Sequence, residues 1–342
     1  MTPTKTLDRG RTQVLVVGAG PVGLLAALRL RDQGIDVRVV DQQPAERSHT
    51  FPVVLHPLSV RLLNDLGLVA PLFWRGRPVT RLAVYTEYER RAVLELPEAT
   101  GVTSGAVTLP QDILRQALIS ALRQRGVTIE WNLRLAELQQ DQQSAWGRLV
   151  QRDPLGTMHQ GAPRADDSAF EADFVIGADG YESTVRETLG IELVAAGPLQ
   201  TFAFFDAPTR RTGIEAQLAL SEDFSNSVYP QQGGISRFSF QVSKALHGAA
   251  DHGSLCELVA ARLPWYGEVP GRCDWSGVAE FRSALVSHFG RGRIWLAGEA
   301  AHLTSPIGVQ SMNVGLDEAN ELALHISQQL RHPGCKPFGD DY

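Results

Sequence analysis

Short apolar runs near the start of the chain follow the pattern of one strand–helix–strand unit. Val14–Val17 is wholly apolar and rich in β-branched residues, which predicts a strand buried on both faces of a parallel sheet. A helix is predicted over Leu24–Arg31, ended near Gly34, and a second buried strand over Val37–Val40. Such a unit takes about 30 residues, so this part of the chain predicts a parallel α/β sheet.

Segments of the same character recur much later in the chain. Phe174–Gly177 and Ile294–Ala297 are apolar runs that predict two more buried strands. Gln111–Arg125 predicts an amphipathic helix, and Gln310–Leu330 predicts a closing helix. Shorter elements are also predicted: a helix over Ser59–Leu66 and strands over Leu82–Tyr85, Ala92–Leu96 and Val127–Trp131. Residues 139–170 are rich in Gln, Asp, Gly and Pro, which predicts a surface hairpin region or loop.

The pattern changes between about 198 and 245. Apolar and polar residues alternate there in short runs separated by turn residues, which indicates antiparallel sheet; the runs are Thr201–Phe205, Glu215–Leu220, Ser227–Tyr229 and Arg237–Val242. The predicted fold is therefore α/β, with a discontinuous Rossmann-type domain of the glutathione-reductase-like kind and an inserted antiparallel-sheet domain. We expect residues 1–80, 100–195 and 280–342 in the first domain, and residues 81–99 and 196–279 in the second, which would bind a substrate.

Composition excludes some classes of function. The formal net charge of -6 gives no reason to expect nucleic acid or an anionic membrane as a partner. The three cysteines, Cys256, Cys273 and Cys335, form no CxxC pair, so neither a zinc site nor a disulfide framework is indicated. Residues 1–11 lack a signal-peptide pattern, and no apolar run approaches the roughly 20 residues that cross a bilayer. We expect a soluble cytoplasmic protein with no metal.

A glycine-rich turn follows the first predicted strand. In Gly18-Ala19-Gly20-Pro21-Val22-Gly23, the first glycine permits a tight turn, the second lets a pyrophosphate approach the backbone, and the third lets helix and strand pack closely. Asp41 ends the second strand, where a carboxylate can accept hydrogen bonds from ribose hydroxyls. A structural glycine turn is the alternative interpretation, and the motif alone does not separate FAD from NAD.

Two later segments distinguish an FAD-binding protein from an NAD-binding one. Residues 294–302, IWLAGEAAH, and residues 306–313, PIGVQSMN, resemble the "GD" segment of the para-hydroxybenzoate hydroxylase family, the group A flavoprotein hydroxylases. Ala178-Asp179-Gly180, with Ser183 and Arg186, resembles the family's "DG" segment. The three motifs occur in the family's order, and the resemblance extends over nearly the whole chain.

The resemblance implies a set of residues around FAD. Gly18, Gly20 and Gly23 would hold the pyrophosphate, Asp41 the adenosine ribose and Glu299 the ribityl chain. Pro306 would lie beside the isoalloxazine close to the substrate, the one residue assigned near the reacting atoms. The cofactor-binding set is Gly18, Gly20, Pro21, Val22, Gly23, Asp41, Gln42, Arg47, Gln111, Arg115, Asp179, Arg186, Gly298, Glu299, Pro306, Gly308, Val309, Gln310, Ser311, Met312 and Asn313.

The resemblance also implies a reaction. NADH or NADPH would reduce the flavin, O2 would give a C4a-hydroperoxide, and its distal oxygen would attack an electron-rich carbon of a small, typically aromatic, substrate. Cofactor chemistry of this kind needs positioning and electrostatics from the protein. A flavin-dependent reductase or oxidase on the same fold, or a degenerate non-catalytic flavin- or ligand-binding protein, are the alternatives.

The chain departs from the family pattern at several positions. Glu299 replaces the family's Asp, and Ser311 stands where Gly is usual, so either the backbone is ordinary there or the loop along the flavin is altered. Family members often carry a basic residue just before Val53, where the nearest arginine is Arg47. Relatives also continue after the last long helix, whereas this sequence stops at Tyr342.

Several residues have both a functional and a structural interpretation. His302 and His56 could act as bases, although structural histidines are the commoner case. Tyr229, Phe204, Phe238 and Phe240 could line an aromatic substrate pocket, or they could be packing residues of the sheet. His247 and His252 match no HExxH zinc signature, and the absence of a GxSxG segment argues against an α/β-hydrolase.

Overall fold

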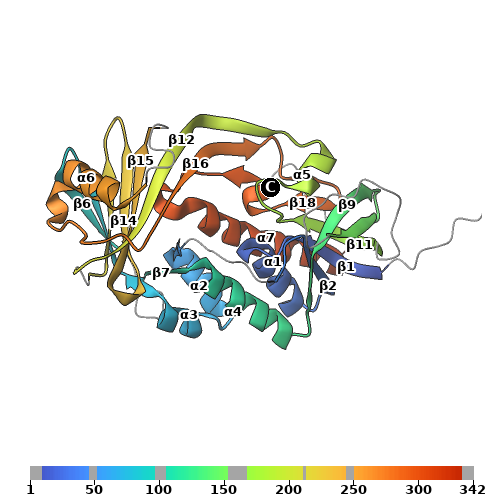
Figure 1. The fold of residues 1–342 in the computed structure, drawn as a ribbon. Coiled ribbons are helices and arrows are strands. Elements are labelled where there is room, and N and C mark those ends of the chain that lie inside the picture. The colour runs from blue at the N-terminus through green and yellow to red at the C-terminus, as the bar shows by residue number, and fades with distance from the viewer. Residues whose placement is uncertain are drawn as a thin grey trace, which may run out of the picture.

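The computed structural model describes residues 10–45, 52–96, 105–152, 168–210, 213–243 and 250–332. Their strands form two eight-stranded sheets and one three-stranded sheet. Figure 1 shows the two large sheets with a group of helices beside them, and the long strands β12 (Leu193–Pro208) and β16 (Trp275–Val286) extending from the second sheet on the left towards the first sheet on the right.

The first sheet has a parallel centre. Its path is β17-β18-β11-β1-β2-β8, and the neighbours from β18 to β8 pair in parallel. The predicted strand–helix–strand unit is confirmed as β1 (Gly10–Val17), α1 (Pro21–Asp32) and β2 (Val37–Asp41). The other strands of the path are β8 (Ile129–Trp131), β11 (Ser168–Gly177), β17 (Gly290–Arg291) and β18 (Ile294–Leu296).

Alternate residues of β1 point to opposite faces of this sheet, and both faces are covered. Val14 and Val16 pack into the apolar cluster of α1, α4 (Gln111–Gln124) and α7 (Gln310–Arg331). Leu15 and Val17 pack into a second cluster, with residues of β9 (Leu133–Gln140), β10 (Ala145–Gln151) and α5 (Thr184–Leu189). Burial on both faces explains why the strand sequence is continuously apolar.

The hairpin alternative predicted for residues 139–170 is the one that the described part of this segment shows. β9 and β10 form an antiparallel hairpin, and β10 also pairs with β11, so the hairpin extends the first sheet. The described part of residues 139–170 is therefore mostly strand. Polar residues dominate there because one face of the hairpin is open to solvent.

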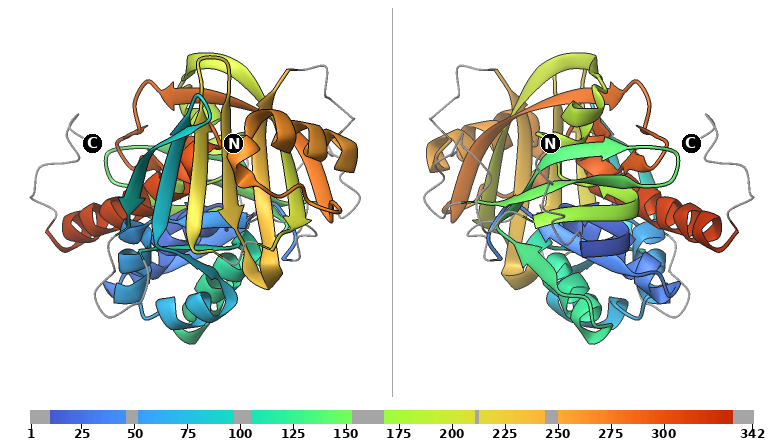
Figure 2. Two further views of the ribbon diagram at one scale, coloured as in Figure 1. Left: turned by 90° about the vertical axis from the view of Figure 1, so that its left-hand side faces the viewer. Right: turned by 90° about the vertical axis from the view of Figure 1, so that its right-hand side faces the viewer.

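The second sheet is mainly antiparallel, in the order β19-β16-β12-β15-β14-β13-β5-β6. Its outer face is covered by α6 (His252–Arg262), as Figure 2 shows in its left view. The predicted strands are confirmed, but β12 begins before residue 198, and β16 was not predicted. The expected boundaries at 195/196 and 279/280 fall inside β12 and β16. The other strands are β5 (Arg81–Thr86), β6 (Glu89–Glu95), β13 (Glu215–Leu220), β14 (Ser225–Pro230), β15 (Ile235–Val242) and β19 (His302–Leu303).

A small antiparallel sheet lies between these two parts. It has the order β3-β7-β4 and is accompanied by α2 and α3, of which α2 corresponds to the predicted helix and α3 was not predicted. The bounds are β3 (Pro52–Leu55), α2 (Pro57–Asp65), α3 (Val69–Arg75), β4 (Arg77–Val79) and β7 (Ala106–Pro110). β7 leads directly into α4, so this sheet fixes where α4 begins.

Candidate functional site

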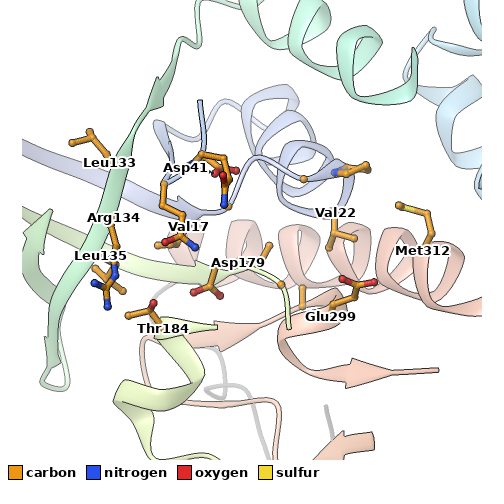
Figure 3. Close-up of a pocket in the computed structure, with 18 of the residues that line it drawn as sticks. Val17, Val22, Asp41, Leu133, Arg134, Leu135, Asp179, Thr184, Glu299 and Met312 are labelled. Atoms are coloured by element: carbon orange, nitrogen blue, oxygen red, sulfur yellow. Dashed lines mark hydrogen bonds between the residues drawn. The ribbon is translucent and has the colours of Figure 1, made fainter. Parts of the chain in front are cut away.

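A cavity of about 250 Å³ lies where β1, β2, β11 and β18 end and where α1, α4 and α7 begin. Ligands of open α/β sheets bind at this edge, beyond the carboxyl ends of the parallel strands. In Figure 3 the cavity extends from Leu133 and Arg134 at one end, past Asp41 and Asp179, to Glu299 and Met312 at the other. The cavity is therefore elongated, with helix N-termini along its wall.

The glycine motif fits a pyrophosphate at the N-terminus of α1. A Cβ on Gly18 would lie 2.2 Å from the Ala178 carbonyl oxygen, and one on Gly23 would lie 2.1 Å from the Gly18 oxygen, so both positions require close backbone packing. A Cβ on Gly20 would meet nothing within 4 Å, because this residue faces the cavity. No side chain caps α1, which leaves its N–H groups and positive dipole end for an anion.

Asp41 is buried at the end of β2 and lines the cavity. Its Oδ2 atom accepts a hydrogen bond from the Ala19 N–H at 2.7 Å, and its Oδ1 atom accepts one from the Gln43 N–H at 2.7 Å. The carboxylate therefore fixes the glycine turn to the end of β2. Because each carboxylate oxygen has a second lone pair, Asp41 can still accept a ribose hydroxyl.

Asp179 lies at the end of β11, on the opposite wall from Asp41 (Figure 3). It accepts the Ser183 hydroxyl at 2.5 Å and the Val185 N–H at 3.1 Å. Burial raises the pKa of this carboxyl, and these two hydrogen bonds oppose the rise. Arg186 is buried behind the loop and donates to the carbonyl oxygens of Tyr181 and Ala300, so it joins the loop after β11 to the turn after β18.

Glu299 lies on the turn after β18 and points into the cavity (Figure 3). Burial raises the pKa of its carboxyl, and nearby His302 opposes that rise. His302 itself is buried, with Nε2 2.8 Å from Oε2 of Glu318 on α7, and the same Glu318 oxygen accepts the Gly298 N–H at 3.1 Å. The structural interpretation of His302 is therefore the one that its contacts favour.

The loop that opens α7 carries two successive left-handed residues. Gly308 has a φ of 78° and Val309 a φ of 50°. Ser311, where the sequence raised the question of an altered backbone, is an ordinary helical residue of α7. The positive φ values therefore occur two and three residues earlier, and Ser311 gives no reason to regard the site as degenerate.

His56 and Tyr229 hold this loop from two sides. The His56 Nε2 atom is 2.8 Å from the Gly308 carbonyl oxygen, and burial lowers the pKa of this histidine. Burial raises the pKa of Tyr229 to about 12, opposed by a hydrogen bond from the Gly308 backbone. Tyr229 belongs to β14 of the second sheet, so the backbone of one residue, Gly308, connects the second sheet with the segment that precedes α2.

Asn313 secures the same loop from inside. Its side-chain amide donates to the carbonyl oxygens of Val54 and Val309, both at 2.8 Å. Its Oδ1 atom accepts the His56 N–H and the Ser59 hydroxyl, both at 2.7 Å. All of its hydrogen-bonding groups are thus used within the protein, and a side-chain contact of Asn313 with the cofactor is not part of this arrangement.

The cavity gathers about half of the predicted cofactor set. Arg47 lies outside the described residues. Predicted residues that line the cavity are Gly18, Gly20, Pro21, Val22, Asp41, Gln42, Gln111, Asp179, Glu299, Ser311 and Met312. Nine other predicted residues do not line the cavity: Gly23, Arg115, Arg186, Gly298, Pro306, Gly308, Val309, Gln310 and Asn313. Several of these nine contact the segments that carry the lining residues. One example is Arg115, which donates to the Ala45 carbonyl and lies over the Trp131 ring.

Other lining residues were missed by the sequence analysis. Leu133, Arg134 and Leu135 form one end of the cavity, directly after β8. The rule that ligands bind beyond the carboxyl ends of parallel strands accounts for them once β8 is known to pair with β2, which the structure shows. The remaining missed residues are Val17, Gln43, Ala178, Gly180, Thr184 and Ala297.

The structure does not bring the four predicted substrate-pocket aromatics together. Phe238 and Phe240 pack in the cluster that α6 covers, on the outer face of the second sheet. Tyr229 packs with Val309 on the other face. The strand register places Phe204 on that same face, where it contacts the ring of Phe281. For Phe238 and Phe240, sheet packing is therefore the better interpretation.

Two absences hold within the described ranges. No helix there has the length and apolar character needed to cross a membrane. No group of three or more His, Cys, Asp or Glu side chains in the same ranges is arranged to hold a metal ion.

Curated relatives match almost the whole chain. 6-Methylpretetramide 4-monooxygenase of Streptomyces rimosus is 28% identical over 350 residues, which is 96% of this chain and 58% of the relative. Para-nitrophenol 4-monooxygenase of Pseudomonas sp. strain WBC-3 is 26% identical, over 96% of this chain and 81% of the relative. The chain spans between about three fifths and four fifths of the length of these relatives.

The fold is shared with solved structures. The crystal structure of p-nitrophenol 4-monooxygenase from Pseudomonas putida DLL-E4 has a TM-score of 0.78 and 24% identity, and the match covers 96% of this chain and 82% of that one. This likeness concerns the fold. A family model described as "FAD binding domain" matches residues 11–336. The chain therefore belongs to this FAD-binding family, and its cofactor is FAD.

Proposed function

We propose that this chain is an FAD-dependent monooxygenase that hydroxylates a small, aromatic compound with NADH or NADPH and O2. The observation that carries the proposal is the meeting of three motifs at one cavity. Gly20, Asp179 and Glu299 come from segments far apart in the sequence and line the same space. The names of the relatives support it, since both are monooxygenases, and one is named for a nitrophenol.

In this proposal, different residues of the chain bind different parts of FAD. The N-terminus of α1 at Gly20 binds the pyrophosphate, and Asp41 accepts hydroxyls of the adenosine ribose. Glu299 faces the ribityl chain, and the N-terminus of α7 points its positive dipole end toward the riboflavin half. The bound flavin supplies the electron transfer and the oxygen activation, whereas the protein positions it and limits access of water.

The substrate lies, in this proposal, between the riboflavin half and the inner face of the second sheet. Tyr229 and Phe204 are on that face, and Pro306 precedes the loop that Tyr229 holds. The division into an FAD-binding domain of residues 1–80, 100–195 and 280–342 and a substrate-binding domain of 81–99 and 196–279 belongs to the same proposal. β12 and β16 then carry the chain from one domain to the other.

The test is oxygen incorporation. Purified protein loaded with FAD is mixed with NADH or NADPH and a panel of substituted phenols under 18O2, and the products are analysed by mass spectrometry. A monooxygenase places one 18O atom in the phenol that also stimulates nicotinamide oxidation. Nicotinamide oxidation that yields only hydrogen peroxide with every phenol would indicate a reductase or oxidase, and FAD binding without any nicotinamide oxidation would indicate a non-catalytic flavoprotein.

A further inference from the structure

A second hollow lies on the outer face of the second sheet, apart from the FAD cavity. Its volume is about 340 Å³, compared with about 250 Å³ for the FAD cavity. Cavities that hold small molecules typically measure about 300–1,000 Å³. Val228 and Gln217, which pair across β14 and β13, form part of its floor. The next residue of β14, Tyr229, points to the opposite face, where it packs with Val309. The hollow is therefore separate from both FAD and the substrate proposed above.

The hollow forms where the cover of this face ends. Phe238 lies under α6 and contacts the ring of Tyr266 edge-on, with 5.3 Å between the ring centroids. Tyr266 ends the short 3-10 helix Pro264–Tyr266, and its side chain lines the hollow. Two residues before Phe238, on the same face of β15, the much smaller Ser236 also lines the hollow. The change from a phenylalanine to a serine along one strand thus leaves space beside Tyr266 that no described side chain fills.

Neutral polar groups lie at the buried side of the hollow. Gln217, Ser236 and Tyr266 line it and are only 4%, 3% and 2% exposed. The Ser236 hydroxyl lies 2.9 Å from Thr209 Oγ1 but 3.5 Å from the Tyr266 hydroxyl. Gln217 Oε1 accepts the Trp265 indole N–H at 3.4 Å. The two longer contacts are weak, because such hydrogen bonds usually measure about 2.7–3.0 Å. A hydroxyl can take part in three hydrogen bonds and a carboxamide in four, so Ser236 and Gln217 can bind a further polar atom.

The rest of the wall is apolar. Val228 and Pro230 lie on the strand side, and Ile214, which is 41% exposed, lies at the opening. Ordered water alone suits such a wall poorly, since a buried water makes about three hydrogen bonds and these side chains offer it none. An occupant with an apolar body and a polar end matches both parts of the hollow.

The charged groups that line the hollow are neutralised by neighbouring residues. The Arg81 Nε atom is 3.0 Å from Glu95 Oε1, and the Arg81 side chain is 51% exposed. Glu215 Oε2 is 2.5 Å from the Arg90 guanidinium, and Glu215 Oε1 accepts the Gln217 amide N–H at 3.4 Å. An ionised ligand would lose its hydration without meeting an uncompensated charge of opposite sign, which is strongly unfavourable. The hollow therefore suits an uncharged ligand.

We propose that this hollow binds a small, uncharged organic molecule through one hydroxyl group and an apolar body. The hydroxyl group meets Ser236 and Gln217 at the buried side. The apolar body lies against Val228, Pro230 and Ile214. This site goes beyond the proposed function, since it lies outside the FAD cavity and its occupation requires no turnover.

Cyclohexanol and cyclohexanecarboxylate are the probes, because they share one ring and differ in charge at neutral pH. Binding is followed by fluorine NMR of the FAD-loaded protein labelled with fluorotryptophan, with the Trp265 resonance assigned through Trp265→Phe. Trp265 is a local reporter, because its indole N–H bonds Gln217. We expect cyclohexanol to shift this resonance saturably, with a dissociation constant of about 1–10 mM, and the carboxylate to bind at least about tenfold more weakly.

Three variants test the contacts. Ile214→Trp fills the opening from an exposed position and should weaken cyclohexanol binding at least about tenfold, because the indole takes the space of the ring. Ser236→Ala removes one hydroxyl and should weaken binding about three- to tenfold. Leu94→Trp, the matched change at a 52% exposed residue that does not line the hollow, should leave the dissociation constant within about twofold.

A Trp265 resonance that does not move at about 50 mM cyclohexanol would overturn the proposal and indicate that the hollow holds only water. Equal binding of the two probes, or unchanged cyclohexanol binding by Ile214→Trp, would overturn it as well. Thermal unfolding of each variant shows that it is folded. Failure to hydroxylate any phenol, with this binding pattern intact, would remove the proposed reaction and leave the site standing.

Discussion

His302 and Glu318 form a buried pair, with His302 Nε2 2.8 Å from Glu318 Oε2, and the same oxygen receives the Gly298 N–H at 3.1 Å. One carboxylate thus fixes both ends of the short turn that carries Glu299 into the cavity. These contacts favour a positioning interpretation of His302, in which a side chain of α7 sets the direction in which Glu299 points.

Replacement of Glu318 should therefore affect both folding and cofactor binding. Glu318→Ala leaves a buried imidazole and a backbone N–H without their acceptor, which costs about 1–3 kcal/mol of unfolding free energy. We expect FAD binding to weaken several-fold in addition, because the Glu299 turn loses its anchor. Urea denaturation and FAD titration measure the two effects. Gln328→Ala, at an exposed position of the same helix, is the control and should change the unfolding free energy by less than about 0.5 kcal/mol.

Gly20→Ala separates binding from folding. Gly20 has a φ of -73°, which alanine adopts without strain, and its Cβ would meet no protein atom within 4 Å. The stability of the FAD-free protein should therefore stay nearly constant, whereas FAD binding should weaken by tenfold or more, because the methyl group enters the space proposed for the pyrophosphate. Gly18→Ala, whose Cβ would overlap the Ala178 carbonyl, should instead destabilise the protein itself. Unchanged FAD binding by Gly20→Ala would refute the placement of the pyrophosphate.

His56 gives the FAD-free protein a pH dependence of known sign. Burial lowers the pKa of His56 below its ordinary value of 6.5. The unfolded chain therefore binds the proton more readily, and the contribution of neutral His56 is complete above pH 6.5 and is lost as the pH falls through the folded-state pKa. Tyr229, with a pKa of about 12, does not titrate in this range. Urea midpoints between pH 5 and 8 should fall on acidification, less steeply in His56→Gln than in wild type; parallel curves would count against His56 as the source.

Val309 is a β-branched residue with a φ of 50°, a conformation that costs an L-residue about 1–2 kcal/mol. Its side chain packs against Tyr229 and its neighbours, so a single substitution mixes lost packing with relieved strain. A pair of variants separates them. Val309→Ala removes the side-chain packing but leaves the strained backbone conformation. Val309→Gly removes the packing and also relieves the strain. We therefore expect Val309→Gly to be more stable than Val309→Ala by about 1 kcal/mol in chemical denaturation; the reverse order would mean that the loop is unstrained.

Local pattern was enough to predict the strand–helix–strand unit, because the signals that form it are contained in residues 14–41. The same holds for Asp41 and the glycine turn. The role of Leu133–Leu135 was not visible in the same way, since it arises from where β8 lies beside β2, a pairing of distant segments. Propensity also failed at Val309, where glycine would be expected, because packing against Tyr229 and anchoring by Asn313 override the local preference.

The walls of the cavity are distributed along almost the entire polypeptide. Gly18 is near its beginning, Asp179 near its middle, and Glu299 and Ser311 near its end. During synthesis the ribosome therefore releases the glycine turn at Gly18 long before the turn that carries Glu299 and the first turn of α7. The nascent chain can present only part of the cavity, and stable capture of the cofactor has to wait until the last strand and helix have left the ribosome. FAD consequently stabilises the folded state by mass action only in chains in which both the early and the late segments of the cavity have folded.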